Sequence, residues 1–355
     1  MPQGSPTSDS QPFGYTSVNV YVSSEKGHNV VTEQLVVFMP TLPDDVVELA
    51  RSLAPAGYRV EVADLAVDRD HALGLMRRAD YLLGFPYHLD REAFEAAAGS
   101  VKLIQLLSAG FDEIDVNLSA EHGIPVATNG GANSVAVSEH TLLLTLAALK
   151  RLPALSKAVL DSEWPVPNTY SSDIFELSGK TFGLVGLGQI GKKVAHLAQA
   201  FGATVVYFDV FRPDPSVETE LDVEYLELNE LLARADVVSL HLPFSELTDR
   251  MIGREQFTVM KPGAVLVNTA RGQLVDEDAM LEALDSGRLR AAALDTLAHE
   301  PATAQSSPLV GHPRVIVTPH SAGSTWDSWT TRLVNGFSNI QSIAAGDAPR
   351  WKVSP

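Results

Sequence analysis

The sequence predicts an α/β protein with two domains, each built on a parallel sheet. Short apolar runs typical of strands alternate with helical segments along most of the chain, and this alternation is typical of parallel sheets covered by helices on both faces. The chain has 355 residues, which is long enough for two domains. A glycine-rich turn at residues 186–191 begins a second series of strands and helices, so we expect the second domain to be built around it.

The first series lies between about residue 33 and residue 128. Residues 1–32 are rich in Ser, Pro, Gly, Asn and Thr without a sustained period, and we expect them to form a disordered N-terminal extension. The apolar patterns then predict strands at 35–39, 58–62, 81–85 and 101–107, and helices at 44–53, 70–78 and 90–98.

The second series follows a long helix at residues 134–151, which is apolar around most of its circumference. Such a helix is buried on more than one side, either between the domains or in a dimer interface. The later patterns predict strands at 182–185, 204–208, 237–240, 264–268, 291–294 and 315–317, and helices at 228–233 and 278–285. The last helix, at about 326–345, has one apolar face formed by Trp326, Trp329, Leu333, Phe337 and Ile340. We expect this helix to fold back onto the first domain.

Composition excludes several classes of function. The net charge of −18 argues against nucleic acid or an anionic membrane surface as a partner. A small anionic substrate is compatible with this charge only if a local cation captures it. The absence of cysteine excludes disulfides and thiolate catalysis and agrees with a cytoplasmic location. The ten histidines do not cluster, so we expect no metal site.

The glycine turn has the G-x-G-x-x-G spacing of a dinucleotide-binding site. Gly186 allows the tight turn, Gly188 lets the backbone approach a pyrophosphate, and Gly191 lets the following helix pack closely on the strand. The helix N-terminus offers unpaired N–H groups to phosphates. A P-loop is the nearest alternative pattern, but Lys193 stands where that motif needs a hydroxyl for Mg²⁺.

An acidic residue at the end of the next strand indicates which dinucleotide binds. Asp209 lies 18 residues beyond Gly191, where a carboxylate accepts hydrogen bonds from ribose hydroxyls and repels a 2′-phosphate. NAD is therefore favoured, while the nearby Arg212 keeps NADP as an alternative.

Three charged residues follow predicted strands at the edge where α/β proteins bind ligands. Arg271, Glu300 and His320 also have structural explanations when taken singly: a surface cation, a carboxylate at a helix start and a strand-end histidine. Beside a nicotinamide they form a coherent set. An imidazole supplies a proton to a developing alkoxide, a carboxylate raises the pKa of that imidazole, and a guanidinium holds a substrate carboxylate by two hydrogen bonds.

Residues from about 35 to 350 resemble the D-isomer-specific 2-hydroxyacid dehydrogenases. The resemblance is carried by the segments SAGFD (108–112), NSVAVSE (133–139), GLGQIG (186–191), HLP (241–243), VNTARG (267–272), LD (294–295) with EP (300–301), and TPHSAG (318–323). Two positions bear on the choice within the family. Formate dehydrogenases have Gln where Glu300 stands, and phosphite-oxidising members have Lys where Ala109 stands. These two activities are therefore disfavoured.

The resemblance implies a Rossmann-type cofactor domain at residues 129–321 and a flavodoxin-like substrate domain in two pieces, 33–128 and 322–355. It implies reduction of a 2-oxoacid, or oxidation of the (R)-2-hydroxyacid, by a homodimer that uses NAD. The family also contains NAD-sensing corepressors without catalytic activity, and a specialised substrate such as a phosphonate-bearing oxoacid is a further alternative.

The resemblance also implies a role for individual residues. His320 would be the general acid and base, Glu300 its partner, and Arg271 the group that binds the carboxylate and carbonyl. The remaining substrate contacts would come from Ala109, Gly110 and Asn133. The cofactor would contact Gly186, Gly188, Gln189, Ile190, Gly191, Asp209, His241, Leu242, Pro243, Thr269, Ala270, Arg271, Asp295 and His320.

Overall fold

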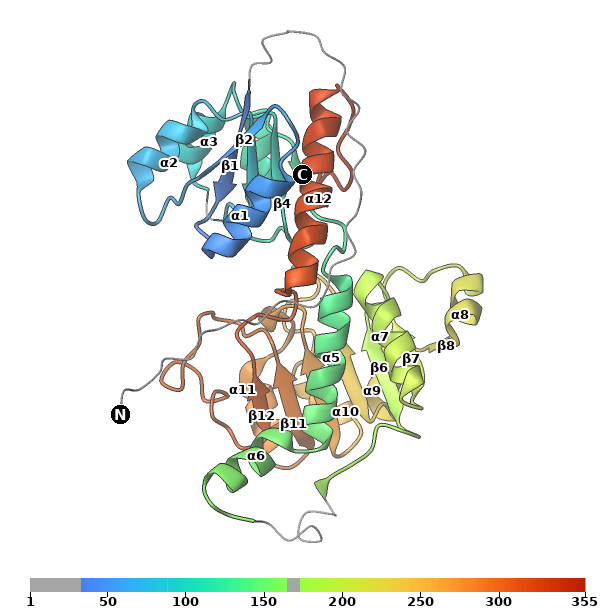
Figure 1. Ribbon diagram of the computed structural model, residues 1–355. Coiled ribbons are helices and arrows are strands. Elements are labelled where there is room, and N and C mark those ends of the chain that lie inside the picture. Colours follow the sequence, from blue (N-terminus) through green and yellow to red (C-terminus); the bar gives the residue numbers. More distant parts are fainter. Residues whose placement is uncertain (1–32, 88, 165–172, 355) are drawn as a thin grey trace, which may run out of the picture.

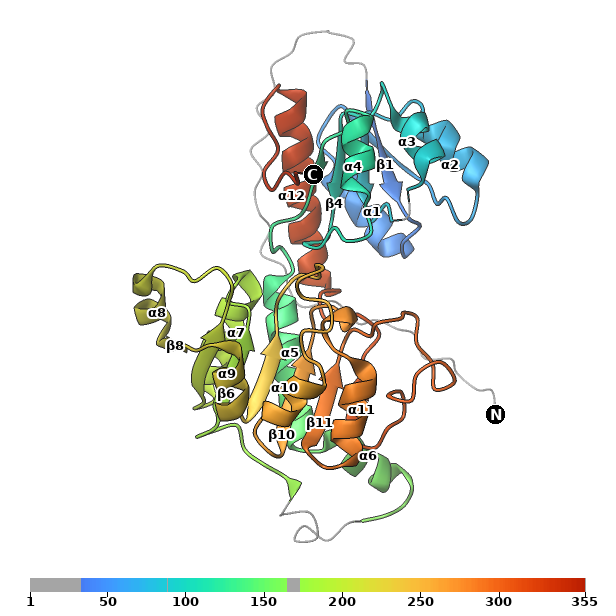
Figure 2. The same ribbon diagram turned by 180° about the vertical axis from the view of Figure 1, so that it is seen from behind.

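The computed structural model describes residues 33–87, 89–164 and 173–354, which form two sheets with their covering helices (Figures 1 and 2). The predicted extension at 1–32 lies outside the described residues. The first sheet has five parallel strands in the order β2-β1-β3-β4-β5, which is the flavodoxin-like order. Its strands are β1 (Gln34–Met39), β2 (Tyr58–Val62), β3 (Tyr81–Gly84), β4 (Leu103–Leu106) and β5 (Val126–Ala127).

The second sheet has seven parallel strands in the order β12-β11-β10-β9-β6-β7-β8. Numbered within this sheet, the order is the 3-2-1-4-5-6 of a dinucleotide-binding fold with one added strand. Its strands are β6 (Thr181–Val185), β7 (Thr204–Phe208), β8 (Val223–Tyr225), β9 (Val237–Leu240), β10 (Ala264–Asn268), β11 (Leu289–Leu294) and β12 (Val315–Val317). The predicted fold class, with two parallel-sheet units, is confirmed.

Helices cover both faces of each sheet, so the central strands are buried on both sides and read as continuous apolar runs. On the first sheet, α1 (Asp44–Leu53) and α12 (Trp326–Ala344) cover one face, and α2 (Arg69–Met76), α3 (Arg91–Ala97) and α4 (Val116–Glu121) the other. The second sheet is covered by α5 (Ser134–Leu149), α7 (Gln189–Ala200) and α8 (Pro215–Leu221) on one face, and by α9 (Leu228–Arg234), α10 (Arg254–Val259) and α11 (Glu277–Asp285) on the other.

The last helix returns to the first sheet although it follows the last strand of the second sheet (Figure 1). Leu333, Phe337 and Ile340 are buried in one cluster with the side chains of β1. The amide of Asn339 donates a 2.8 Å hydrogen bond to Gln105 Oε1 in the same buried layer. Trp326 departs from the expected apolar face, because it is 39% exposed at the first turn. The residue boundaries of the two domains stay a prediction.

The long helix α5 is a core helix of the second domain. It packs against α7, β10 and β11, and eleven of its sixteen residues are buried. The neighbouring helix α6 (Leu152–Leu160) has no buried residue, although apolar side chains dominate it. Figure 1 shows α6 projecting from the end of the second domain that lies far from the first domain.

We predict that shortening Phe337 to alanine destabilises the first domain by about 3–5 kcal/mol, because a fully packed ring is lost between α12 and β1. The matched control is Val334→Ala on the same helix, where the side chain is 50% exposed and the expected change is within about 0.5 kcal/mol. Urea unfolding followed by circular dichroism measures both, and equal midpoints for the two variants would contradict this packing.

Candidate active site

The glycine turn joins β6 to α7 at the point where the strand order of the second sheet reverses. Gly186 has φ +107°, and a Cβ there would lie 2.7 Å from the carbonyl oxygen of His241. A Cβ on Gly191 would lie 2.2 Å from the carbonyl oxygen of Gly186, so α7 starts in direct contact with the turn. At Gly188, by contrast, a Cβ would meet no described atom within 4 Å. The turn therefore has open space at the one glycine where a pyrophosphate needs it.

The first turn of α7 can hold an anion. Gly188 is the N-cap and supplies no side-chain cap, so among the described residues no side chain caps this end. Gln189 and Ile190 form the first helical positions, and their N–H groups point out of the helix at its positive dipole end. The residues present thus fit the diphosphate of a dinucleotide.

Asp209 lies at the end of β7 and is held against the turn. Its Oδ2 accepts a 2.7 Å hydrogen bond from the N–H of Leu187, and its Oδ1 accepts one of 3.0 Å from the N–H of Phe211. Arg212 has an acidic partner, because its guanidinium donates two hydrogen bonds to Glu218, of 2.7 and 3.1 Å. The carboxylate thus faces the dinucleotide turn, while the nearby cation is neutralised by its own neighbour.

The segment after β9 closes the other side of the turn. The His241 ring forms a 2.9 Å hydrogen bond with Ser239 Oγ, and burial lowers the pKa of His241 to about 3, so the ring is neutral. The buried Leu242 side chain lies against Gly186, and Pro243 next to it is exposed. These three residues contribute apolar surface and backbone rather than charge.

The end of β10 positions Arg271. The buried Asn268 side chain accepts a hydrogen bond from the N–H of Ala270 (3.0 Å) and donates one to the carbonyl of Arg271 (2.8 Å). Thr269 Oγ1 lies 2.9 Å from Thr141 Oγ1 on α5. Asn268 was not predicted as a site residue, although its place inside the VNTARG segment was the available signal.

The Arg271 side chain crosses from the second domain to the first. Its Nε donates a 2.5 Å hydrogen bond to Asp112 Oδ2, and its Nη2 occupies the space that a Cβ on Gly110 would need, so a side chain there would displace the guanidinium. Within the described residues, the N–H groups of Ala109 and Gly110 donate no hydrogen bond to the protein. The predicted carboxylate-binding residues are therefore brought together. Asp112 was missed as a partner although it ends the SAGFD segment.

His320 and Glu300 meet at the carboxyl ends of β11 and β12. His320 Nδ1 lies 2.8 Å from Glu300 Oε2, and Glu300 Oε1 accepts a 2.9 Å hydrogen bond from the N–H of Leu297. His320 has φ +50°, a conformation that is uncommon for a residue with a side chain and is often found at functional sites.

Asp295 holds the loop that carries His320. Its buried carboxylate accepts hydrogen bonds from Thr318 Oγ1 (2.6 Å), the Ser321 N–H (2.9 Å) and the Ala322 N–H (2.9 Å). Its own carbonyl accepts a 2.8 Å hydrogen bond from the N–H of His320. In this structure the Asp295 side chain is therefore engaged with the loop, and its predicted contact with the cofactor stays a prediction.

The His320–Glu300 contact shifts both pKa values. The hydrogen bond to Glu300 raises the pKa of His320, with burial and Arg271 opposing it. For Glu300, burial raises the pKa, but the hydrogen bonds from His320 and from the Leu297 N–H together with nearby positive charge outweigh it and lower the pKa. A carboxylate thus faces an imidazole that holds its proton more strongly than a free one.

Asn133 lies where the chain passes from the first sheet into α5. It is the N-cap of α5, but its side chain does not cap the helix. Its Nδ2 lies 2.7 Å from the position of a Cβ on Gly323, three residues beyond His320. Asn133 therefore contacts the His320 loop and is placed at the junction of the two domains.

Among the residues that the structure describes, no group of three His, Asp or Glu side chains is arranged to hold a metal ion. No helix in the same residues is long and apolar enough to cross a membrane.

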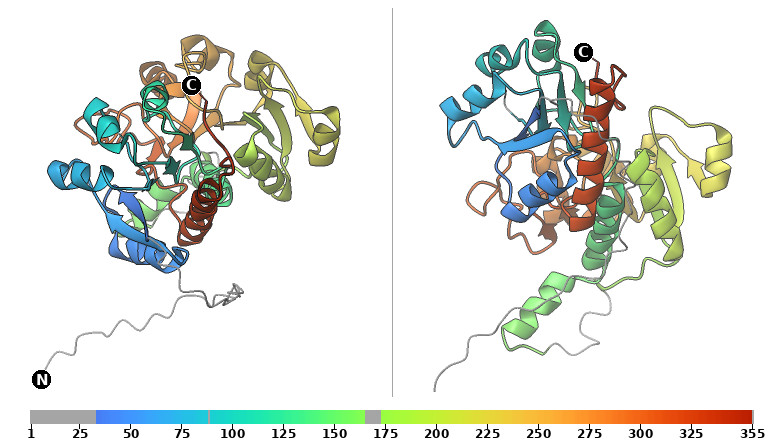
Figure 3. Two further views of the ribbon diagram at one scale, coloured as in Figure 1. Left: turned by 90° about the horizontal axis from the view of Figure 1, so that it is seen from above. Right: turned by 45° about the horizontal axis from the view of Figure 1, so that its top comes forward.

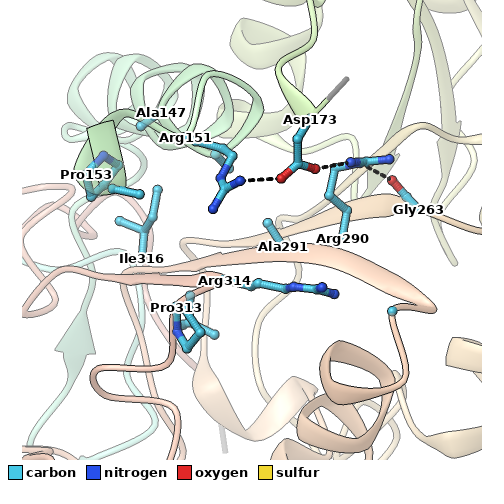
Figure 4. A pocket seen from close by; sticks show the side chains of 14 residues that line it. Ala147, Arg151, Pro153, Asp173, Gly263, Arg290, Ala291, Pro313, Arg314 and Ile316 are labelled. Atoms are coloured by element: carbon cyan, nitrogen blue, oxygen red, sulfur yellow. Dashed lines mark hydrogen bonds and ion pairs between the residues drawn. The ribbon is translucent and has the colours of Figure 1, made fainter. Parts of the chain in front are cut away.

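A separate cavity of about 380 Å³ lies at the opposite, amino-terminal edge of the second sheet (Figure 4). Arg151, Arg290 and Arg314 line it together with Asp173, which pairs with Arg151 and, at 2.7 Å, with Arg290. Pro153 and Ala154 of α6 form part of its wall. None of the predicted site residues lines this cavity, so it is distinct from the candidate active site.

The fold and the site define a protein with a dinucleotide-binding type of sheet and a histidine–carboxylate pair at the carboxyl ends of its strands β11 and β12. Residues 142–322 match the family model described as "D-isomer specific 2-hydroxyacid dehydrogenase, NAD binding domain". The chain belongs to this family, and these residues match the family's NAD-binding domain.

Known relatives carry several activities. The chain is 40% identical over 309 residues to D-3-phosphoglycerate dehydrogenase of Mycobacterium bovis, covering 85% of this chain and 57% of that enzyme. It therefore spans little more than half the length of that relative. It is 34% identical over 262 residues to glyoxylate reductase of Korarchaeum cryptofilum, covering 74% of this chain and 78% of the relative. The crystal structure of the TT0316 protein from Thermus thermophilus is similar with a TM-score of 0.78 and 33% identity, covering 90% of this chain and all of that one.

We predict that the pKa of His320 lies above 6.5 and falls in Glu300→Gln, because the hydrogen-bonded carboxylate is lost. In the folded protein the pair is fully charged between the lowered pKa of Glu300 and the raised pKa of His320. The stability that His320 contributes is full below pH 6.5 and disappears as the pH rises through its raised pKa. The contribution of Glu300 disappears as the pH falls through its lowered pKa.

Titration of the histidine ring protons by NMR measures this shift, with His320→Gln used to assign the signal. His241 is the internal control, because its buried ring should stay neutral in both proteins. An unchanged His320 titration in Glu300→Gln would contradict the pairing.

Proposed function

We propose that this protein is an NAD-dependent dehydrogenase that interconverts a 2-oxoacid and the (R)-2-hydroxyacid. The observation that supports this most strongly is the 2.8 Å contact between His320 and Glu300, in the same site as Arg271. Reduction of a carbonyl beside a carboxylate requires a proton donor and groups that bind the carboxylate. His320 with Glu300 would supply the proton, and Arg271 with the N–H groups of Ala109 and Gly110 would bind the carboxylate.

When NAD is bound, its nicotinamide exchanges a hydride with the substrate carbon. The residues Gly186 to Gly191 and Asp209 would hold its diphosphate and adenosine, and Thr269, Ala270 and Asp295 the nicotinamide end. Arg271 and the N–H groups of Ala109 and Gly110 orient the substrate carboxylate. His320 donates a proton from its ring to the oxygen as negative charge develops there, and takes it back in the reverse direction. Glu300 keeps the imidazole in the orientation and protonation state that this step needs.

The site favours NAD over NADP, because Asp209 would repel a 2′-phosphate and Arg212 is already paired with Glu218. Use of NAD together with a cysteine-free sequence supports a cytoplasmic location.

A non-catalytic NAD-sensing protein is the second candidate function. Open space at Gly188 supports dinucleotide binding in either case. Turnover distinguishes the two functions. A sensor binds NADH but does not oxidise it in the presence of any 2-oxoacid.

We predict that the protein oxidises NADH in the presence of small 2-oxoacids such as glyoxylate, hydroxypyruvate or pyruvate.

In His320→Ala, kcat should fall by about 100- to 10,000-fold because the general acid is lost, while NADH still binds. Arg271→Lys should mainly raise KM, because an ammonium cannot form the two parallel hydrogen bonds of a guanidinium. Absorbance at 340 nm measures turnover, and NADH fluorescence measures binding. NADH binding without turnover of any 2-oxoacid would favour the sensor.

We also propose that the chain forms a homodimer through α6. Helix α6 has no buried residue, and Leu152, Val159, Leu160 and Trp164 in and just after it are between 50% and 82% exposed. Clustered exposed apolar side chains of this kind are typical of an interface, and a second copy of the same chain is the commonest partner. The cavity beside α6 offers a recess for such a partner (Figure 4).

We predict that the wild-type protein elutes with twice the 38.1 kDa chain mass and that Leu160→Asp shifts it toward the monomer. The control is Val67→Asp, which places the same charge at a side chain that is 79% exposed on the first domain. Light scattering coupled to size-exclusion chromatography measures the masses, and a monomeric wild type would refute the dimer.

A further inference from the structure

A second arginine is buried beside the candidate site without a carboxylate partner. Arg332 on α12 is only 5% exposed, and no carboxylate among the described residues lies within ion-pair distance of it. Burial lowers the pKa of Arg332 to about 10, so it is still charged at neutral pH. Buried charges in proteins are normally paired, and an unpaired one is costly. Among the described residues, no anion therefore balances the charge of this buried guanidinium.

The hydrogen bonds of Arg332 are also incomplete. Its Nη2 donates a 2.7 Å hydrogen bond to the carbonyl of Gly323, but its buried Nε has no acceptor in the described part of the chain. The neighbouring Asn133 has a buried Oδ1 that likewise has no donor. Arg332 Nη2 and Asn133 Nδ2 both lie 2.7 Å from the position of a Cβ on Gly323, so the two side chains converge on this residue.

This cluster lies next to the proton-transferring pair. Gly323 follows His320 by three residues on the loop that Asp295 holds, and Asn133 starts α5. Burial raises the pKa of Tyr87, and the nearby Arg271 and Arg332 both oppose this shift, so the hydroxyl lies near both cations. The starts of α5 and α12 meet at the junction of the two domains (Figures 1 and 3). Two cations, Arg271 and Arg332, thus lie near Tyr87. Arg271 is already the residue proposed to bind the substrate carboxylate.

We propose that Arg332, with Asn133 beside it, binds a second anionic group, a phosphate or a carboxylate, on the side of the 2-oxoacid away from Arg271. This inference rests on the proposed function and adds to it the substrate class, a dianionic 2-oxoacid. The aromatic rings of Phe85 and Trp329, whose centres lie 5.8 and 5.1 Å from the Arg332 guanidinium carbon, hold the planar group in place. Arg332 is a specificity-determining residue in this arrangement, and proton transfer stays with His320.

A purely structural role explains these contacts less well. One hydrogen bond to Gly323 and two aromatic contacts anchor α12, but an apolar side chain of similar length would fill the same space without burying an unpaired charge. A ligand anion would satisfy both the charge and the free Nε, and the amide of Asn133 can turn to present its NH₂ group or its oxygen.

The test compares substrates that differ only in the charge of the distal group. 3-Phosphohydroxypyruvate is paired with hydroxypyruvate, and 2-oxoglutarate with 2-oxovalerate, so that the phosphate and carboxylate arms are read separately. In the wild type we expect kcat/KM to be about 10- to 100-fold higher for the anionic member of at least one pair, mainly through KM. Arg332→Met should abolish this preference, and Arg332→Lys should retain part of it. Arg234→Met, at an exposed arginine paired with Glu224, is the control and should keep the wild-type ratio.

Turnover of both members with equal kcat/KM in the wild type would overturn the inference and leave the proposed function intact. An equal loss for both members in Arg332→Met would also overturn it, because that is the result of a structural role. A readout that does not need turnover separates the two proposals. Inorganic phosphate should raise the unfolding temperature of the wild type more than that of Arg332→Met, even if no 2-oxoacid is reduced. Equal shifts in the two proteins would refute the anion site.

Discussion

The buried carboxylate of Asp295 is the contact on which the candidate site depends. It sits at the end of β11 and accepts three hydrogen bonds from the segment that follows β12, so the last loop of the second sheet is fixed to its neighbour. His320 lies inside this segment in a left-handed conformation, and its ring meets Glu300 there.

A second constraint acts between the two domains. Asn268 in the second domain donates a hydrogen bond to the backbone carbonyl of Arg271, and Asp112 in the first domain accepts one from its guanidinium, so this residue is held by both domains. The absence of a side chain at Gly110 is what lets the guanidinium approach the first-domain loop. The helix α12 links the same halves in another way, because it starts beside the His320 loop and ends on the first sheet. Movement of one domain relative to the other would therefore change the surroundings of the arginines and of His320 together.

Most apolar patterns predicted their elements well, and the elements that were missed are short. β9 and β10 lie where the sequence predicts them, because strands buried on both faces leave an unbroken apolar run between polar ends. β12 is also at its predicted place although it is a half-buried edge strand, because its three residues are all β-branched. The pairs α4 with β5 and α8 with β8 were not predicted. They span few residues at the edges of the sheets, where half-buried positions leave no clear period.

The same distinction holds at the site. Arg271 and His320 lie in short motifs, so the sequence could indicate them as candidate site residues, and their roles stay predictions. Arg332 could not be indicated in this way, because its importance comes from burial without a partner, and a lone arginine on an amphipathic helix is expected to be exposed. Asp112 and Asn268 are intermediate cases, since both lie inside quoted segments but their partners are set by the packing of two loops.

The charge distribution of the chain bears on how an anionic substrate would be bound. A chain with a net charge of −18 repels small anions over most of its surface, so an anionic substrate needs cations that are local and poorly screened. Arg271 and Arg332 meet this need differently. The first is partly neutralised by Asp112 and partly exposed, whereas the second is buried and has no acidic partner among the described residues. Electrostatic attraction is stronger where water is excluded. The buried arginine is therefore the one whose interaction with a distal anion would discriminate most sharply between substrates of similar shape.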